Sequence, residues 1–154
     1  MAKNSSNSDV ISGLLGVGSH FHGRINFSDT LRIDGVVCGE IICKKSKKSV
    51  LIITETAKVE ADIIADIVIV SGMVSGNIKA IERLELHAPG RVEGMVYTSD
   101  FYIQDGALFQ GECITIRHLS TEEKEALKLE GFYNIHSTNV LTSNRKAIQN
   151  LLDY

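Results

Sequence analysis

The histidines, cysteines and glycines of this 154-residue chain are the residues whose types and spacing could support chemistry. His20 and His22 stand two positions apart, so in a β-strand they share one face and could hold a metal ion with a third ligand from a neighbouring strand. That third ligand is missing from the pattern. We interpret both as solvent-facing histidines and predict no metal site.

Motifs for nucleotide, zinc and redox chemistry are missing from the sequence. There is no GxxxxGK[ST] loop, and Gly16-Val-Gly18-Ser-His-Phe21 lacks the final glycine of a GxGxxG loop. Cys38, Cys43 and Cys113 show no CxxC spacing and leave an odd thiol. The carboxylates fall where a solvated charge is the ordinary role. We therefore predict no catalytic residue and no cofactor, and a reducing cytoplasmic location is the simpler interpretation.

Composition is typical of a soluble one-domain protein with a β-rich core. Hydrophobic residues make up 44% and charged residues 23%, while tryptophan is absent and proline occurs once. Isoleucine and valine crowd the middle of the chain, and β-branched side chains suit a pleated sheet better than a helix. The formal net charge of -3 gives no reason to expect a nucleic acid partner. No apolar run approaches the ~20 residues of a membrane span.

A five-residue phrase organises the middle of the chain: apolar, any, small, any, apolar. Its small residues recur 15 to 22 positions apart. Alternation puts the two apolar side chains on one face, and the small residue between them marks a bend or a close approach of two backbones. Cys113 falls at an apolar position of the phrase, which predicts a small buried side chain. The six copies are Phe21–Ile25, Val37–Ile41, Val59–Ile63, Val74–Ile78, Val92–Val96 and Phe109–Cys113.

A second strand-like segment follows five of the copies, and turn residues such as Asp105-Gly106 lie between them. One coil cannot bury its inner face alone, whereas coils stacked ~4.8 Å apart pair their strands and build a continuous core. We predict an all-β fold, a three-sided parallel β-helix of about six coils, and crossover connections favour right-handed winding. The second segments are Leu31–Ile33, Leu51–Ile53, Ile67–Ile69, Leu84–Leu86 and Phe101–Ile103.

The regions outside the repeat are predicted to be flexible tails. We place an N-terminal tail at 1–18, the β-helix at 19–117 and a C-terminal tail at 118–154. The longest step of the repeat contains Lys44-Lys-Ser-Lys-Lys-Ser49, which we interpret as a polar loop inserted into one coil.

The C-terminal tail carries two short helical patterns. Ser120 and Glu123 have the spacing of a capping box, and 143–152 has an apolar stripe at helical spacing. Isolated helices this short are marginal in water. The tail is therefore either largely disordered, or a docking segment that binds a partner or folds back over the terminal coil.

Ordered phrases along the repeat resemble the bactofilins, a family of bacterial cytoskeletal proteins. The resemblance covers roughly residues 11–116, while the Lys-rich insertion and the long C-terminal tail depart from the family's pattern. It implies a right-handed β-helix that forms filaments without nucleotide, attaches to the inner membrane surface and scaffolds cell-wall or shape-determining proteins. The phrases are Leu31–Gly35, Ala57–Glu60, Gly76–Lys79, Pro89–Gly94 and Ile103–Ala107 followed by Phe109–Gly111.

Both ends of such a rod present unpaired backbone groups and an open apolar interior, which recruit another chain unless something covers them. The segment before the first coil carries no charge or proline that would block pairing. We expect end-to-end self-association and a chain that acts as a filament rather than as an enzyme. The expected contact residues are Phe21, Phe101, Ile103, Phe109, Ile114 and Ile116.

Two segments are candidates for contact with an anionic membrane surface, to which each nearby lysine contributes about 1 kcal/mol. Each also has a simpler interpretation, the N-terminal one as a first half-coil and the lysines as a solvated loop. The candidate residues are Ile11, Leu14, Leu15, Lys44, Lys45, Lys47 and Lys48.

Two alternative functions stay open. Left-handed β-helix acyltransferases also have ~18-residue coils, although their hexapeptides are more regular than the uneven steps of this chain. A β-helix that does not polymerise could also present one flat face to a ligand or partner protein. Protein that pellets without nucleotide supports the filament, whereas a discrete trimer favours the enzyme.

Overall fold

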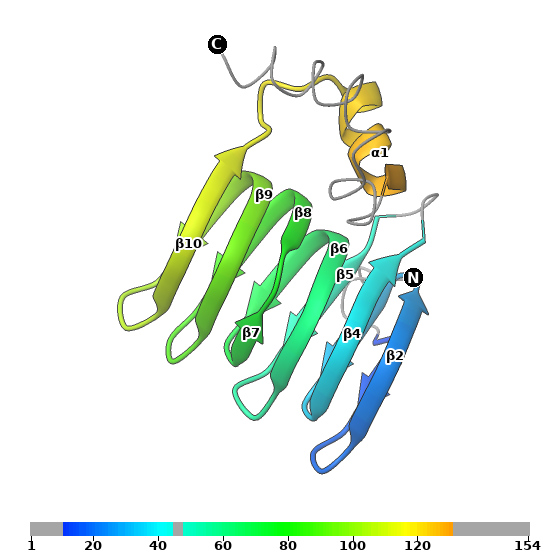
Figure 1. The fold of residues 1–154 in the computed structure, drawn as a ribbon, viewed down its shortest axis with the longest axis vertical. Helices are drawn as coiled ribbons and strands as arrows, with labels where there is room; N and C mark the ends of the chain where they lie inside the picture. The colour runs from blue at the N-terminus through cyan, green and yellow to red at the C-terminus, as the bar shows by residue number, and fades with distance from the viewer. Residues whose placement is uncertain (1–10, 45–47, 131–154) are drawn as a thin grey trace, which may run out of the picture.

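A computed structural model describes residues 11–44 and 48–130, in which ten strands precede one helix (Figure 1). The side chains of the last two helical residues are outside that description. The elements are β1 (Gly13–Leu15), β2 (His20–Phe27), β3 (Thr30–Ile33), β4 (Val36–Cys43), β5 (Val50–Ile53), β6 (Lys58–Val70), β7 (Met73–Ser75), β8 (Ile78–Leu86), β9 (Arg91–Ile103), β10 (Leu108–Thr115) and α1 (Thr121–Glu130).

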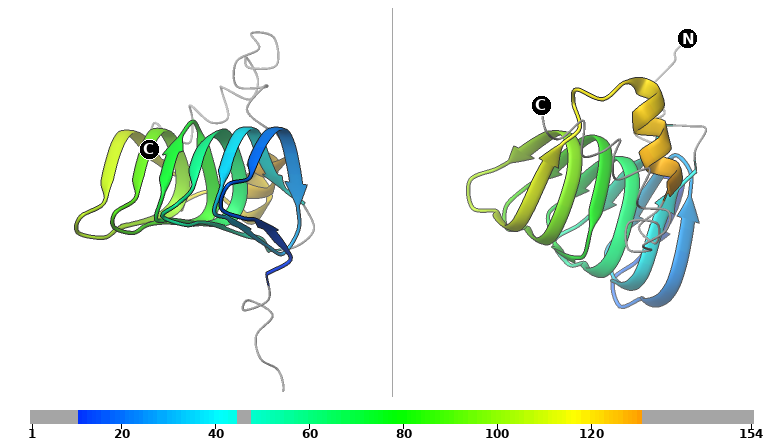
Figure 2. Two further views of the ribbon diagram at one scale, coloured as in Figure 1. Left: turned by 90° about the horizontal axis from the view of Figure 1, so that it is seen from below. Right: turned by 45° about the horizontal axis from the view of Figure 1, so that its top comes forward.

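The described strands all pair in parallel, each coil stacking on the one before it. One ladder runs from β2 through β4, β6, β7 with β8, and β9 to β10. A second runs from β1 through β3 and β5 to the C-terminal halves of β6, β8 and β9. Figure 2 shows the resulting row of closed turns. The predicted parallel β-solenoid of about six turns is confirmed.

The register divides each coil into three sides. Side A contains the residues aligned with Lys58–Glu60, and side B those aligned with Ile63–Ala65. Side C contains the residues aligned with Ile67–Val70. The small residue of the repeated phrase lies between sides A and B.

Columns of aliphatic side chains from the three sides fill the interior. On side C, Leu51, Val68 and Leu84 align in neighbouring coils and are fully buried. Each such side chain contributes about 1.5–3 kcal/mol of burial free energy. Because every coil adds the same kind of residue to each column, the core runs along the rod without a break.

The register of the segment Ile67-Val-Ile69 is set by its neighbour in the stack. Val68 aligns with the buried Leu51, so Ile67 and Ile69 alternate to the other face of the strand. All four residues of Ile67–Val70 are apolar, so their sequence carries no alternation that could fix the register. Of the two isoleucines, Ile69 is partly exposed on the outer surface of side C, whereas Ile67 is only 8% exposed.

The glycine at the centre of the phrase is required by backbone proximity. Gly94 has a φ of 143°, a conformation that only glycine adopts readily, and a Cβ at this position would collide with the carbonyl oxygen of Gly76 in the preceding coil. Of the two sequence interpretations, close backbone approach is therefore confirmed. Ala61 occupies the same column as Gly39 and Gly76 but is not among the positive-φ residues.

Helix α1 lies against the flank of the inner coils, as Figures 1 and 2 show. Its predicted capping box is present: the backbone N–H of Ser120 donates to Glu123 Oε2 over 2.9 Å, and the N–H of Glu123 donates to Ser120 Oγ over 3.2 Å. Leu127 packs with Ile81 and Ile116 in a small separate cluster. The described part of the tail thus does not fold over the terminal coil, and the second helical pattern, 143–152, lies outside the described residues.

Candidate self-association surfaces

The N-terminal rim of the solenoid is formed by β1 and β2. Within the described chain β1 pairs only with β3 and β2 only with β4, so one edge of each strand lacks a ladder partner. Phe21 and Ile25 face the interior but are only partly buried, because no described coil precedes theirs in the stack. This rim therefore combines backbone groups able to pair with an open apolar interior.

The C-terminal rim is formed by β10 and the last residues of β9. The rings of Phe101 and Phe109 meet edge to face with centroids 5.1 Å apart, and both are partly buried against the core. Ile103 aligns with the buried Leu86 yet is 47% exposed. An exposed residue in an otherwise buried column marks the place where the next coil would lie.

Two expected contact residues occupy different positions from the others. Ile114 aligns with Tyr97 and Lys79 on the outer face of side B and is partly buried. Ile116 is 3% exposed, because it packs with Ile81 and Leu127 of α1. Ile116 is therefore covered by the helix in this conformation, and the accessible apolar surface of the C-terminal rim consists of Phe101, Ile103 and Phe109.

The prediction that Cys113 is buried is wrong. The residue aligns with Val96 in the expected column, but it is exposed because it stands in the last coil. Partial burial of the thiol against the apolar rim nevertheless raises its pKa from 9.0. Cys43, in an inner coil, is buried, and the same effect raises its pKa.

The candidate membrane residues are divided between exposed and inward-facing positions. Ile11 and Leu14 are 44% and 59% exposed, whereas Leu15 packs against the core. The segment contains β1, so it forms the first half-coil. Lys44 and Lys48 are exposed, and Lys48 Nζ lies 2.9 Å from Glu82 Oε2. Lys45 and Lys47 lie outside the described residues.

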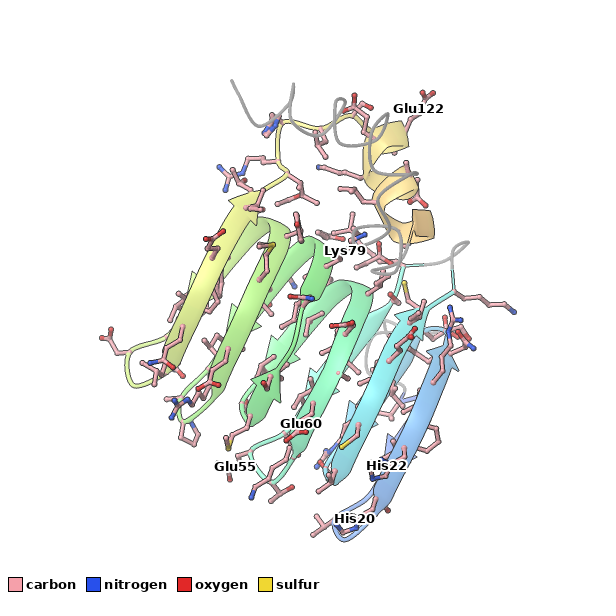
Figure 3. All side chains as sticks on the ribbon, in the orientation of Figure 1. His20, His22, Glu55, Glu60, Lys79 and Glu122 are labelled. Atoms are coloured by element: carbon pink, nitrogen blue, oxygen red, sulfur yellow. The ribbon has the colours of Figure 1, made fainter. Side chains whose placement is uncertain are left out.

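The residues considered for metal binding lie at the edge of the sheet. Figure 3 shows His20 and His22 on β2, and the register places Glu60 two coils away from His22. Within the described part of the chain, no group of three histidine, cysteine, aspartate or glutamate residues is arranged to hold a metal ion. No helix there has the length and apolar content needed to cross a membrane.

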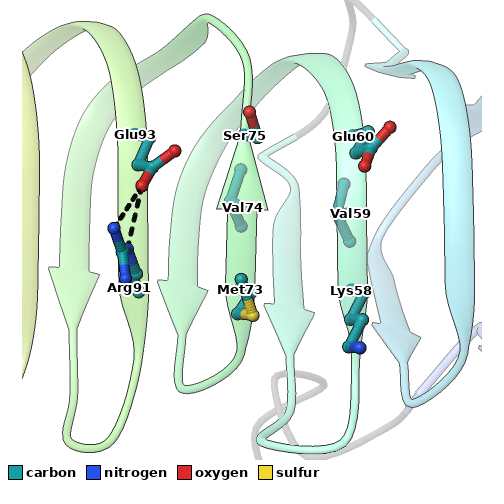
Figure 4. A pocket seen from close by; sticks show the side chains of 8 residues that line it. All are labelled: Lys58, Val59, Glu60, Met73, Val74, Ser75, Arg91 and Glu93. Atoms are coloured by element: carbon teal, nitrogen blue, oxygen red, sulfur yellow. Dashed lines mark hydrogen bonds and ion pairs between the residues drawn. The ribbon is translucent and has the colours of Figure 1, made fainter.

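A shallow notch on side A results from the short strand β7 (Figure 4). Met73 and Ser75 form its floor, between Lys58 and Glu60 on one side and the Arg91–Glu93 ion pair on the other, and its volume is about 80 Å³. Its charged side chains project outward from neighbouring coils. The residues lining the notch include no histidine, cysteine or other ordinary nucleophile, so they do not suggest a catalytic site.

A buried polar cluster between the solenoid and α1 was not anticipated from the sequence. Asp66 Oδ2 accepts hydrogen bonds from Ser49 N, Ser49 Oγ and Lys128 Nζ at 2.9, 3.1 and 3.1 Å. Lys79, fully buried, donates through Nζ to the carbonyl oxygen of Leu127 over 3.1 Å. An aspartate inside the apolar run of β6 was the only local signal, since its partners stand 17 and 62 positions away.

Comparisons with known proteins agree with this arrangement. The Bactofilin family model, described as polymer-forming cytoskeletal, matches residues 13–114. Bactofilin BacP of Myxococcus xanthus (strain DK1622) is 34% identical over 107 residues, which are 70% of this chain and 43% of BacP. Bactofilin BacO of the same strain is 38% identical over 89 residues, which are 58% of this chain and 68% of BacO.

A solved structure also matches. The solid-state NMR structure of the cytoskeletal bactofilin BacA has a TM-score of 0.59 and 29% identity, covering 67% of this chain and 94% of that chain. The matched region contains the solenoid and both rims, whereas the chain spans less than half the length of BacP.

Proposed function

The chain belongs to the bactofilin family of polymer-forming cytoskeletal proteins, and from this premise we propose that its solenoids join end to end into filaments without nucleotide. Assembly itself is then the activity, and the protein is structural rather than an enzyme. The observation that carries the proposal is the pair of open rims. At each rim, strands with one edge unpaired among residues 11–44 and 48–130 surround interior residues that no further coil of that region covers.

The energetics favour stacking over an isolated rod. Joining two rims lets unpaired strand edges form ladders and removes apolar side chains such as Phe109 and Ile103 from water, at about 25 cal/mol per Å² of apolar surface. The described residues include no helix or loop that packs over either rim, and α1 lies on the flank instead. No nucleotide-binding motif is needed for an assembly driven by burial and backbone pairing.

Membrane attachment and scaffolding form a further part of the proposal. The exposed Ile11, Leu14 and Val17 and the lysines at 44 and 48 support contact with the inner face of the cytoplasmic membrane. A filament held there would present a repeating surface to cell-wall or shape-determining proteins. The family relationship supports this proposal over an acyltransferase or a binding module that does not polymerise.

Replacing Phe109 with arginine is expected to weaken polymerisation strongly. Stacking would bury an uncompensated charge, which costs several kcal/mol, so the concentration needed for assembly should rise at least about tenfold. High-speed pelleting without nucleotide and negative-stain electron microscopy measure this directly. Filaments of normal length at the usual concentration would contradict the proposed role of Phe109.

Two further variants separate assembly from folding. Leu108→Arg adds the same charge to the same strand, but Leu108 faces outward and is 45% exposed, so its filaments should persist. Ile103→Arg changes an interior-column residue that is already exposed in the monomer, and it should block assembly while the melting temperature stays unchanged.

Cys113 is expected to lose reactivity when filaments form. Its thiol is exposed in the last coil of the monomer and would be covered by the next subunit. Alkylation by N-ethylmaleimide should therefore slow at least about tenfold in pelleted filaments, because the thiolate must be accessible to react. The Phe109→Arg variant should retain the fast rate, and Cys113→Ser identifies the signal. Equal rates in filament and monomer would place Cys113 outside the contact.

A further inference from the structure

The outer face of side B differs in composition from that of side A. On side A, outward residues such as Lys58 and Glu60 are charged and exposed. On side B, the register aligns one outward residue from each of five successive coils, and four of the five are apolar or aromatic. In order along the rod they are Ile42, Ile64, Lys79, Tyr97 and Ile114.

This outward column is largely withdrawn from water. Ile64 and Lys79 have no exposed surface, and the other three residues are partly buried. Burial raises the pKa of the Tyr97 hydroxyl, and the carboxylate of Glu112 adds to the effect. Ile42 and Ile64 do not belong to the apolar cluster in which Leu127 of α1 packs. The apolar contacts of α1 therefore do not account for the N-terminal part of the face, around Ile42 and Ile64.

Helix α1 ends beside this N-terminal part. The carbonyl oxygen of Leu127 accepts a hydrogen bond from Lys79 Nζ over 3.1 Å, and Lys128 Nζ lies 3.1 Å from Asp66 Oδ2. Ile64 is the register neighbour of Lys79 and stands two positions before Asp66 on β6. Figure 3 shows Lys79 next to the helix. The chain that follows α1 therefore starts close to the apolar column.

The residues beyond the helix have the length and the composition to cover that part of the face. At about 3.3 Å per residue, residues 131–142 could span up to roughly 40 Å, which exceeds the roughly 25 Å of six stacked coils. The helical pattern 143–152 could therefore reach any coil of its own solenoid. Its apolar stripe consists of Ala147, Ile148, Leu151 and Leu152.

Charge favours the same assignment. Arg145 and Lys146 are the only charged residues of 143–152, and both stand near its start. Positive charges in the first turn of a helix oppose the helix dipole, so a helix in this segment gains from carboxylates close to its start. Glu40 and Asp62 align with each other on the outer face of side B and supply carboxylates beside the apolar column.

We propose that residues 143–152 form a helix that docks on the outer face of side B of the same chain, with its apolar stripe over Ile42 and Ile64. A helix this short is marginal in water, so it should form only where the sheet supplies an apolar surface. Side B would then be a covered face in every subunit, monomeric or assembled. The inference does not depend on end-to-end polymerisation, because the face and the segment belong to one chain.

Hydrogen exchange measured by mass spectrometry tests the docking in the full chain, below its assembly concentration. The amides of 143–152 should exchange at least about tenfold more slowly than those of an unstructured chain, because an undocked segment of this length has no lasting helical hydrogen bonds. Ile42→Asp places a charge under the apolar stripe and should return the segment to the unstructured rate. Residues 121–128 should keep wild-type protection, because the contacts of α1 with Asp66 and Ile81 are unchanged.

Ile52→Asp is the matched control on the solenoid. Ile52 also faces outward from a strand and is also partly buried, but it lies on side C, so this variant should retain protection in 143–152. If Ile42→Asp unfolds the coils, Leu151→Asp introduces the same charge from the opposite side of the contact and should give the same loss. Gln149→Asp, on the polar side of the helical pattern, should retain protection.

Three results would overturn the proposal. Exchange of 143–152 at the unstructured rate in the wild-type protein would show that the segment is not docked. Protection that appears only in filaments, and is missing from the Phe109→Arg variant, would assign the segment to a neighbouring subunit. Protection that survives both Ile42→Asp and Leu151→Asp would place the segment on a different surface. Loss of protection in these two variants, with protection retained in both controls, is the result we expect.

Discussion

Replacing Gly94 with alanine is expected to lower the free energy of unfolding by about 4 kcal/mol or more, or to prevent folding altogether. Two effects combine at this position. The backbone has a φ of 143°, which an L-residue rarely adopts. The added Cβ would also collide with the carbonyl oxygen of Gly76 in the coil before. Backbone atoms cannot turn away as a flexible side chain can, so the two coils would have to separate and lose ladder hydrogen bonds.

Two variants in the same column separate the cost of the positive φ from the cost of the collision between the added Cβ and the neighbouring backbone. Gly23 has a similar φ of 136°, but a Cβ there would meet only the ring of Phe21 at 3.6 Å. Gly23→Ala should therefore cost about 1–3 kcal/mol, the strain alone. Ala61→Gly removes a methyl group where φ is ordinary, and it should cost about 1 kcal/mol.

Chemical denaturation of the three purified proteins, monitored by far-ultraviolet circular dichroism, measures these differences. The measurement should use protein below its assembly concentration, since polymerisation adds stability by mass action. A Gly94→Ala variant as stable as Gly23→Ala would show that adjacent coils can move apart at low cost. The requirement for glycine at the positions aligned with Gly94 would then be explained by backbone conformation alone.

The sequence predicts those parts of the fold that repeat locally. The apolar phrase and its glycines recur in every coil, so period-two alternation together with the turn residues was enough to predict stacked parallel strands. The same pattern predicted which residues would lie at the rims, because the first and last members of a column lack a neighbour. Phe109 and Ile103 follow from that logic, and the structure places both at the C-terminal rim.

Features that depend on register or on distant contacts were not accessible in this way. The outward orientation of Ile67 and Ile69 could not be read from four consecutive apolar residues, because such a run has no alternation that distinguishes inward from outward positions. Ile116 was expected at the rim, but contact with Leu127 buries it. Cys113 was assigned to the correct column, but its exposure depends on the absence of a further coil.

The Asp66 cluster shows how a short helix is fixed to a β-solenoid. A ten-residue helix is marginal in water, and α1 buries few apolar side chains, so its position depends strongly on the polar contacts beneath it. The Lys128 side chain is 3% exposed and that of Asp66 11% exposed. Breaking a buried ion pair by removing one partner typically costs about 3–5 kcal/mol. Without Asp66, the buried ammonium of Lys128 would keep only the longer contact with Glu125 Oε1, at 3.9 Å.

Asp66→Asn is therefore expected to release α1 while the solenoid stays folded. The small Ile81–Ile116–Leu127 cluster cannot compensate for a loss of docking free energy of that size. Protection of the backbone amides in residues 121–128 against hydrogen exchange should therefore fall about a hundredfold. Hydrogen exchange measured by mass spectrometry reports this segment separately from the coils. Peptides from β4, β6 and β8 should exchange at the wild-type rate, because Asp66 faces the helix and is not part of the continuous apolar core.

A double-mutant cycle gives the control. Lys128→Met should also weaken the docking of α1. The double variant Asp66→Asn/Lys128→Met should restore much of the amide protection, because it leaves no unpaired charge buried under the helix. Strictly additive effects of the two substitutions would mean that the ion pair does not hold the helix. Unchanged protection in Asp66→Asn would assign the docking of α1 to Leu127 and to the hydrogen bond from Lys79 instead.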